Sequence, residues 1–115
     1  MAISEFEIKK CERALAEFMK EHRPPVHVRD KLDFSYRISN QTVEIFEIRP
    51  YFKNPAEKIE ISFAKATYVK AKKQWRLYWK RADLKWHSYE SAPATKSIEE
   101  ALTIISEDRD ACFFG

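Results

Sequence analysis

The chain has 115 residues, of which 44% are hydrophobic and 14% aromatic, and its formal net charge is +3 at pH 7. This length and composition predict one globular domain with its own core, and they exclude a disordered chain. The sequence contains one glycine, which excludes the glycine-rich loops that cradle phosphates, GxGxxG and the P-loop.

The expected cellular compartment is inferred from the absence of a membrane-spanning segment and of a signal peptide. No apolar run approaches the roughly 20 residues that cross a bilayer, and the first residues, MAISEFEIKK, do not have the basic-then-apolar plan of a signal peptide. We therefore expect a cytoplasmic protein with no membrane association. Cys11 and Cys112 form no CxxC pair and match no zinc spacing, so we expect reduced, partly buried thiols, with a disulfide between them as the alternative.

A helix is predicted from Ser4 to about Glu21–Arg23. Ser4 and Glu7 have the spacing of a capping box at its start, and Pro24 and Pro25 stop it. Its apolar stripe recurs at helical spacing and consists of Ile8, Cys11, Leu15, Phe18 and Met19. A connector follows from Pro24 to Lys31. His22 and His27 lie near it without a recognisable third metal ligand, so we predict no metal site there.

Alternation of apolar and polar residues predicts strands after the connector. One spans Leu32 to Ile38. The next, Thr42 to Arg49, is apolar on both faces, which favours a central position in the sheet; Pro50 is expected to end it. Residues 51–58 are expected to form a loop with a turn at Asn54-Pro55. The strand Ile59 to Lys70 is longer than usual, which predicts a bend or bulge near Phe63–Lys65.

Two shorter strands, Trp75 to Arg81 and Leu84 to Tyr89, complete a predicted antiparallel meander. In the first, alternation separates Trp75, Leu77 and Trp79 from Arg76, Tyr78 and Lys80. In the second, we assign Leu84 and Trp86 to the tryptophan face. The opposite, basic face is then expected to carry Arg76, Tyr78, Lys80, Lys85, His87 and Tyr89.

A second helix is predicted after Ser97, which forms a capping box with Glu100. Phe113 and Phe114 lie in the tail just before Gly115, and we expect this tail to pack back onto the domain. The predicted class is α+β: an N-terminal helix, an antiparallel meander of about five strands and a C-terminal helix, with both helices on one sheet face.

Several stretches resemble a known family. They are AISEFEIKKCERAL at the start, FEIRP at residues 46–50, ATYVK at 66–70, YWKRADLKWHSYE at 78–90 and the terminal CFFG. Together they resemble the bacterial domain-of-unknown-function family 3024. The resemblance implies a small bacterial single-domain protein. It implies no activity, cofactor or catalytic residue.

The functional hypothesis starts from the segment Lys65 to Tyr89. Its eight lysines and arginines and single acid, Asp83, give a local charge of +7. Bases neutralise phosphates and interleaved aromatic rings stack on nucleobases. The basic face therefore predicts a non-enzymatic module that binds an anionic partner such as single-stranded nucleic acid. The alternative at the same residues is a solvated face whose lysines discourage edge pairing.

Two other function classes stay open. Strand carboxylates could serve a metal-dependent nuclease, and a cleft formed by Glu47, Arg49, Arg81 and Asp83 would be its place. Alternatively, tryptophans projecting from one face could form a protein-interaction surface, including that of a homodimer. Cys112 and His87 could form a nucleophile pair only if the fold brought them together. We predict no cofactor.

Overall fold

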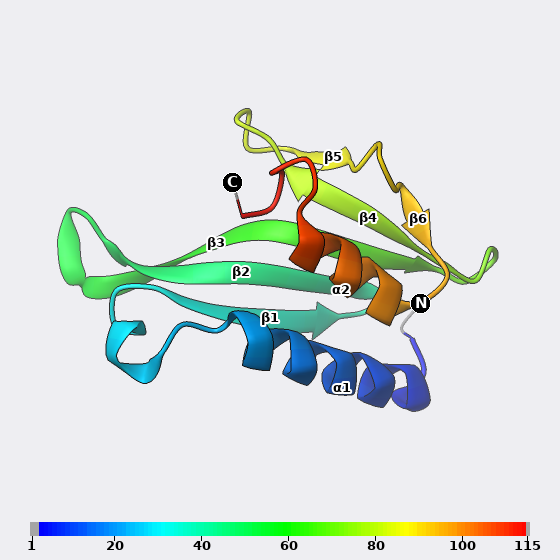
Figure 1. The fold of residues 1–115 in the computed structure, drawn as a ribbon, viewed down its shortest axis with the longest axis horizontal. Helices are drawn as coiled ribbons and strands as arrows, with labels where there is room; N and C mark the ends of the chain where they lie inside the picture. Colours follow the sequence, from blue (N-terminus) through cyan, green and yellow to red (C-terminus); the bar gives the residue numbers. More distant parts are fainter. Residues whose placement is uncertain (1–2, 115) are drawn as a thin grey trace.

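An antiparallel sheet with helices against one face makes up the computed structural model, which describes residues 3–114 (Figure 1). The helical elements are α1 (Glu5–His22), the 3₁₀ turn η1 (Val26–Val28) and α2 (Ile98–Glu107). The strands are β1 (Asp33–Ser39), β2 (Thr42–Tyr51), β3 (Asn54–Val69), β4 (Gln74–Lys80), β5 (Trp86–Ser88) and β6 (Ala94–Thr95). The predicted α+β class and element order are confirmed.

The strands follow one another across the sheet in the order β1-β2-β3-β4-β5. All neighbours pair antiparallel, and β6 pairs with β4 beyond the short β5. Strand β2 is therefore central, as its apolar faces predicted. This meander follows from the short connections, which favour pairing between consecutive strands.

The core lies between the helices and one sheet face. Both predicted caps form: Ser4 Oγ accepts from the Glu7 N–H at 3.2 Å and Ser97 Oγ from the Glu100 N–H at 3.1 Å. The apolar helix stripes then pack on the sheet. The buried cluster includes Cys11, Leu15, Phe18, Ile98, Ala101 and Ile105 from the helices and Val43, Ile45, Ala64, Ala66, Trp75 and Leu77 from the strands.

Strands β2 and β3 extend past the helices as a two-stranded arm, which corrects the loop predicted at residues 51–58 (Figure 1). Pro50 does not end β2. It pairs with Lys58 beside a register irregularity, where the ladder tolerates a missing N–H. The predicted bulge is confirmed, because the register shift between Ile45 and Phe46 leaves Phe63 of β3 without a partner.

The C-terminal tail packs back onto the sheet, as predicted. Phe113 is buried and its ring lies 5.0 Å from that of Tyr89. Asp108 adopts the left-handed conformation at the end of α2, and its carboxylate accepts from the backbone N–H groups of Phe113 and Phe114, both at 2.9 Å. Gly115, the last residue of the CFFG motif, lies outside the described residues.

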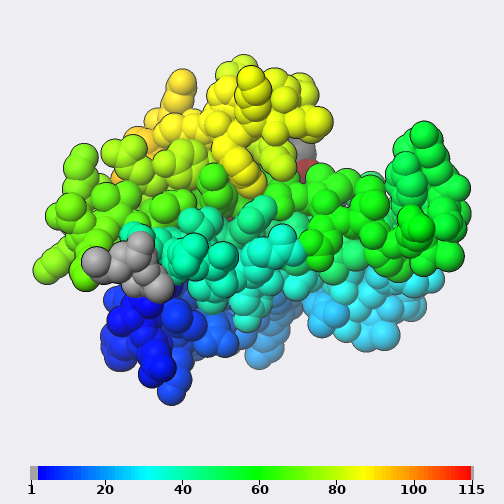
Figure 2. Space-filling view, turned by 180° about the vertical axis from the view of Figure 1, so that it is seen from behind, coloured from blue at the N-terminus to red at the C-terminus, as the bar shows by residue number. Residues whose placement is uncertain are grey.

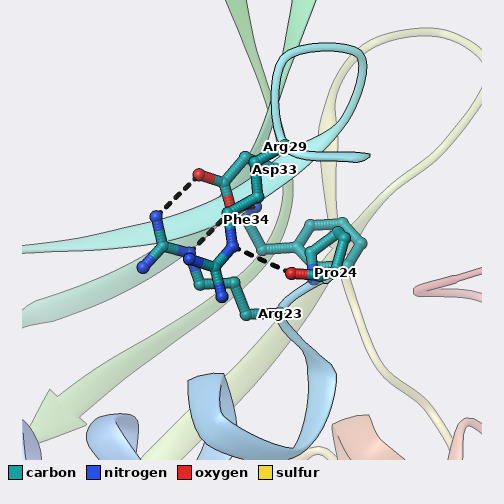
Figure 3. Close-up of polar contacts among 5 residues, drawn as sticks. All are labelled: Arg23, Pro24, Arg29, Asp33 and Phe34. Carbon is teal, nitrogen blue, oxygen red and sulfur yellow. Dashed lines mark hydrogen bonds and ion pairs between the residues drawn. The ribbon is translucent and has the colours of Figure 1, made fainter. Parts of the chain in front are cut away.

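A network of charged side chains fixes the passage from α1 to β1 (Figure 3). The Arg23 guanidinium donates to both Asp33 carboxylate oxygens at 2.9 Å, and the Phe34 N–H donates to the same carboxylate at 2.8 Å. Arg29 donates to the Pro24 carbonyl at 2.9 Å. The hydrogen bond from Arg23 is the main cause that lowers the pKa of Asp33 below its ordinary value.

Candidate functional site

One face of the sheet carries no helix, and the candidate site lies there (Figure 2). Because Trp75 and Leu77 point into the core, the alternate residues of β4 must point to the other side. These are Arg76, Tyr78 and Lys80. Their predicted placement together on an open face is confirmed.

Cross-strand pairing adds residues to this face, since directly opposite side chains project to the same side. Lys65 of β3 lies opposite Tyr78, and Trp86 of β5 lies opposite Lys80. We call the resulting set of Lys65, Arg76, Tyr78, Lys80 and Trp86 the β4 face. The face therefore combines two aromatic rings with three bases.

The rings and the lysines of the β4 face are in contact. Lys65 Nζ lies 5.0 Å from the centroid of the Tyr78 ring and 4.8 Å from that of Trp86, and Lys80 Nζ lies 5.0 Å from the Trp86 ring. These distances are in the range of cation–π attraction. Desolvation by this packing lowers the pKa of Lys65, an effect that neighbouring Glu44 opposes and Lys80 reinforces. The ammonium group of Lys65 is thus held between two rings, and that of Lys80 lies against one of them.

The rest of the helix-free face is close to electrically neutral. Arg37 lies 4.5 Å above the ring of Phe46 and forms an ion pair with Glu60. The Ser62 hydroxyl donates to the Glu44 carboxylate. Positive charge on this side of the sheet is therefore concentrated along β4 rather than spread over all strands.

Three predicted members of the basic face lie elsewhere. Tyr89 is 3% exposed and its hydroxyl donates to Asp110 at 2.9 Å. His87 lies opposite Trp79, on the side of the helices, and its Nε2 is 2.8 Å from the Asp83 carboxylate. Lys85 is exposed in the turn between β4 and β5. The assignment of Trp86 to the tryptophan face was correspondingly wrong.

The turn explains this correction. The Arg81 N–H donates to the Lys85 carbonyl at 3.2 Å, and Leu84 takes a positive φ of 63° between them. The chain returns with Trp86 opposite Lys80, so the alternation in β5 is as predicted but its phase relative to β4 is reversed. Trp86 was missed as a member of the face because only this register reveals it, and Lys65 was missed because its place depends on the pairing of β3 with β4.

The four residues of the predicted cleft, Glu47, Arg49, Arg81 and Asp83, belong to two separate sets of contacts. Glu47 and Arg49 make an ion pair at 2.9 Å on β2, whereas Asp83 bonds to His87 in the turn after β4. Within residues 3–114, no hydrogen bond or ion pair joins one group to the other. The described residues also contain no group of three or more His, Cys, Asp or Glu that could hold a metal ion.

A polar pocket of about 330 Å³ lies where the tail meets β5, and its lining includes Arg81, His87, Asp110 and Cys112. The fold thus brings Cys112 and His87 to one pocket, which nothing in the sequence indicated. Burial is the largest cause that raises the pKa of Cys112, and Asp110 raises it further. The thiol is therefore disfavoured as a nucleophile. Both cysteines are free, and burial raises the pKa of Cys11 to about 12.

A groove of about 620 Å³ runs between α1 and α2 on the opposite side of the molecule. Ala14, Phe18 and Leu102 form its apolar floor. Its charged rim is net negative and consists of Glu17, Glu21, Glu99 and Glu107 together with Lys10 and Arg13. The helices therefore present a surface of the opposite charge to the β4 face.

Comparison with known proteins supplies a family without an activity. No curated protein and no solved structure matches the chain. In the part of the chain that the structure describes, no helix has the length and apolar character needed to cross a membrane. The model of a domain of unknown function, DUF3024, matches residues 3–115. The chain therefore belongs to the DUF3024 family.

Proposed function

We propose that this protein is a non-enzymatic binding module for an anionic partner, and that single-stranded nucleic acid is the partner class that its β4 face fits. The observation that carries the proposal is the packing of Tyr78 and Trp86 among Lys65, Lys80 and Arg76 on a face without helices. Bases of the protein neutralise phosphates, and its rings offer flat surfaces on which nucleobases stack.

The shape of the β4 face favours a single strand. Seven strand residues span about 24 Å at roughly 3.4 Å per residue, which gives an extended chain room for several nucleotides. Tyr78 and Trp86 are half-buried, so each ring retains accessible surface. A duplex keeps its bases stacked on one another and could use only the charges, whereas an unpaired strand could use the rings as well.

The turns at both ends of β4 extend the positive charge. Lys72 and Lys73 lie in the turn before the strand, and Arg81 and Lys85 lie in the turn after it; all four side chains are exposed. A bound polyanion would therefore meet positive charge beyond both ends of the face, which favours an orientation along β4.

The same proposal includes a location in the cytoplasm of a bacterial cell. The bacterial origin is the one implied by the family resemblance. Both cysteines are free, which suits a reducing compartment.

The direct test is a charge-reversal pair with a matched control. Arg76→Glu combined with Lys80→Glu removes two bases from the β4 face. Lys9→Glu combined with Lys20→Glu changes the net charge equally, at exposed positions of α1. We expect the first variant to bind a fluorescent single-stranded oligonucleotide at least about tenfold more weakly, equivalent to about 1.4 kcal/mol. The control should bind nearly as well as the unmodified protein.

Two results would contradict the proposal. Equal loss in both variants would mean that only net charge matters, and no binding at low salt by the unmodified protein would exclude a nucleic-acid partner. Incubating the same oligonucleotide with Mg²⁺ or Mn²⁺ separates binding from catalysis. Cleavage that Glu47→Ala abolishes would establish the nuclease alternative instead.

A further inference from the structure

The arm formed by β2 and β3 leaves one edge of β3 open. Within residues 3–114, β3 pairs with β4 only from Ala64 to Val69, whereas it pairs with β2 from Asn54 onward. The outer edge of residues 57–62 therefore has no neighbouring strand. An open edge of this kind is a template for pairing with another strand. In Figure 2 the arm projects from the body of the molecule as the green lobe.

The side chains of the open edge are exposed and include apolar ones. Ile59 is 36% exposed and Ile61 is 40% exposed. They project on the side of the sheet that carries the helices, since they lie opposite Arg49 and Glu47 of β2. The neighbouring charged residues of the strand, Glu57, Lys58 and Glu60, are also exposed.

We propose that this edge pairs with the same edge of a second copy of the chain, antiparallel and centred on Ile59. A two-fold axis that relates two antiparallel edge strands runs perpendicular to the sheet. This axis keeps every side chain on its own side of the sheet, and directly opposite residues of an antiparallel pair also share a side. The axis must therefore lie between one residue and the same residue of the second copy.

Charge and length together favour one register among those centred on residues 57–61. Centring on Glu57, Lys58 or Glu60 places that residue against its own copy, and like charges directly opposite are destabilising. Centring on Ile61 pairs Glu60 with Ser62, so it opposes no charges of opposite sign, and β4 blocks this edge from Ala64 onward. Centring on Ile59 instead places each Lys58 opposite Glu60 of the second copy and pairs the two Ile59 side chains. The edge is thus self-complementary in this register.

The groups needed for these cross-copy contacts are accessible. Lys58 donates to the Asp30 carbonyl within its own chain, and its ammonium has three N–H donors. One oxygen of Glu60 accepts from Arg37, which leaves the second oxygen for a partner. The paired segment ends near Pro55, which has no N–H, and before Ala64, where β4 begins.

The dimer would join two sheets into one, with both helix-free faces on the same side because the axis is perpendicular to the sheet. Two β4 faces would then be available to one long single strand of nucleic acid. This last consequence rests on the proposed function, whereas the dimer itself does not.

Cysteine cross-linking tests the register directly. One cysteine would be introduced at each of positions 57 to 61 in turn, in a Cys112→Ser background that keeps only the buried Cys11, and the full-length protein would be oxidised. Only the residue on the axis meets its own copy at a Cα separation of about 5 Å, within the range for a disulfide. One position away, the separation rises above about 8 Å, because two residue rises are added along the strand. We expect Ile59→Cys to cross-link fastest, and a maximum at another position would overturn the register.

Sedimentation over a micromolar to millimolar concentration series tests the dimer without engineered thiols. Lys58→Glu should weaken self-association about fivefold or more by placing like charges opposite each other. The charge swap Lys58→Glu with Glu60→Lys should restore it. A monomer throughout the series, or a swap that fails to restore association, would overturn the proposal. Neither measurement involves nucleic acid, so this inference can fail while the proposed function stands.

Discussion

At the scale of single residues, Trp86 is the side chain whose position in the structure differs most from the predicted one. The alternation of its strand suggested a core residue, but it lies on the helix-free face, where two lysine ammonium groups are within 5.0 Å of its ring centroid. Its ring can hold those lysines by cation–π attraction and offer its remaining surface to a nucleobase.

Replacing Trp86 by alanine should therefore weaken binding of a single-stranded oligonucleotide by about 1–3 kcal/mol, the usual contribution of one base–aromatic stack. Phe52→Ala is the matched control, because Phe52 is an aromatic residue 82% exposed at the tip of the arm. Fluorescence anisotropy measures both affinities, and thermal unfolding checks that both variants are folded. Equal affinities in the two variants would remove stacking from the mechanism.

At the scale of elements, the junction of α1 and β1 depends on a charge that can be titrated. The hydrogen bonds from Arg23 and from the Phe34 backbone stabilise ionised Asp33 and lower its pKa from the ordinary 3.8. The unfolded chain then binds more protons than the folded one between the two pKa values, so stability rises with pH in that window. The stabilisation is complete above the ordinary pKa and is lost as pH falls through the lowered one.

Asp33→Asn should remove this dependence. Denaturant unfolding at a series of pH values from about 2 to 6, which brackets the ordinary carboxyl pKa, should show a shallower acid loss of stability than in the unmodified protein. Asp30→Asn changes an exposed carboxylate of the same connector and should retain the original slope. Identical slopes in all three proteins would mean that the Arg23–Asp33 pair contributes nothing to acid sensitivity.

Element boundaries show how far sequence reasoning reaches. The caps at Ser4 and Ser97 were predicted from residues close together in the chain, and the bulge near Phe63 was predicted from the unusual length of its strand. The continuation of β2 through Pro50 was not predicted. Pairing with β3 along the arm outweighs the local preference of proline to end a strand.

At the scale of the whole molecule, charge is divided between two surfaces. The segment from Lys65 to Tyr89 carries +7 and the chain +3, so the remaining residues sum to −4. The acidic residues outside that segment include the glutamates at the rim of the groove between α1 and α2. A polyanion would accordingly be steered toward the β4 face and away from the helices.

Salt dependence measures how many phosphates the β4 face contacts. At least three contacts, from Lys65, Arg76 and Lys80, should give a slope of about −2 or steeper for log affinity against log salt concentration on a single strand. In the variant with glutamate at positions 76 and 80, the slope should become less steep by about 1.4, because two phosphate contacts are lost. An oligonucleotide with a neutral backbone should bind more weakly than the natural one. Equal affinity for the two would contradict phosphate recognition.

Helix caps, apolar stripes and the alternation within each strand follow from the sequence alone, since each depends on residues only a few positions apart. The membership of the β4 face does not. For Trp86 it depends on which residue of β5 meets Lys80, and the turn around Leu84 sets that register; for Lys65 it depends on the pairing of β3 with β4. The open edge of the arm and the meeting of Cys112 with His87 likewise arise from contacts between distant segments. Periodicity assigns a side chain to one of two faces, but only pairing between strands shows which faces coincide.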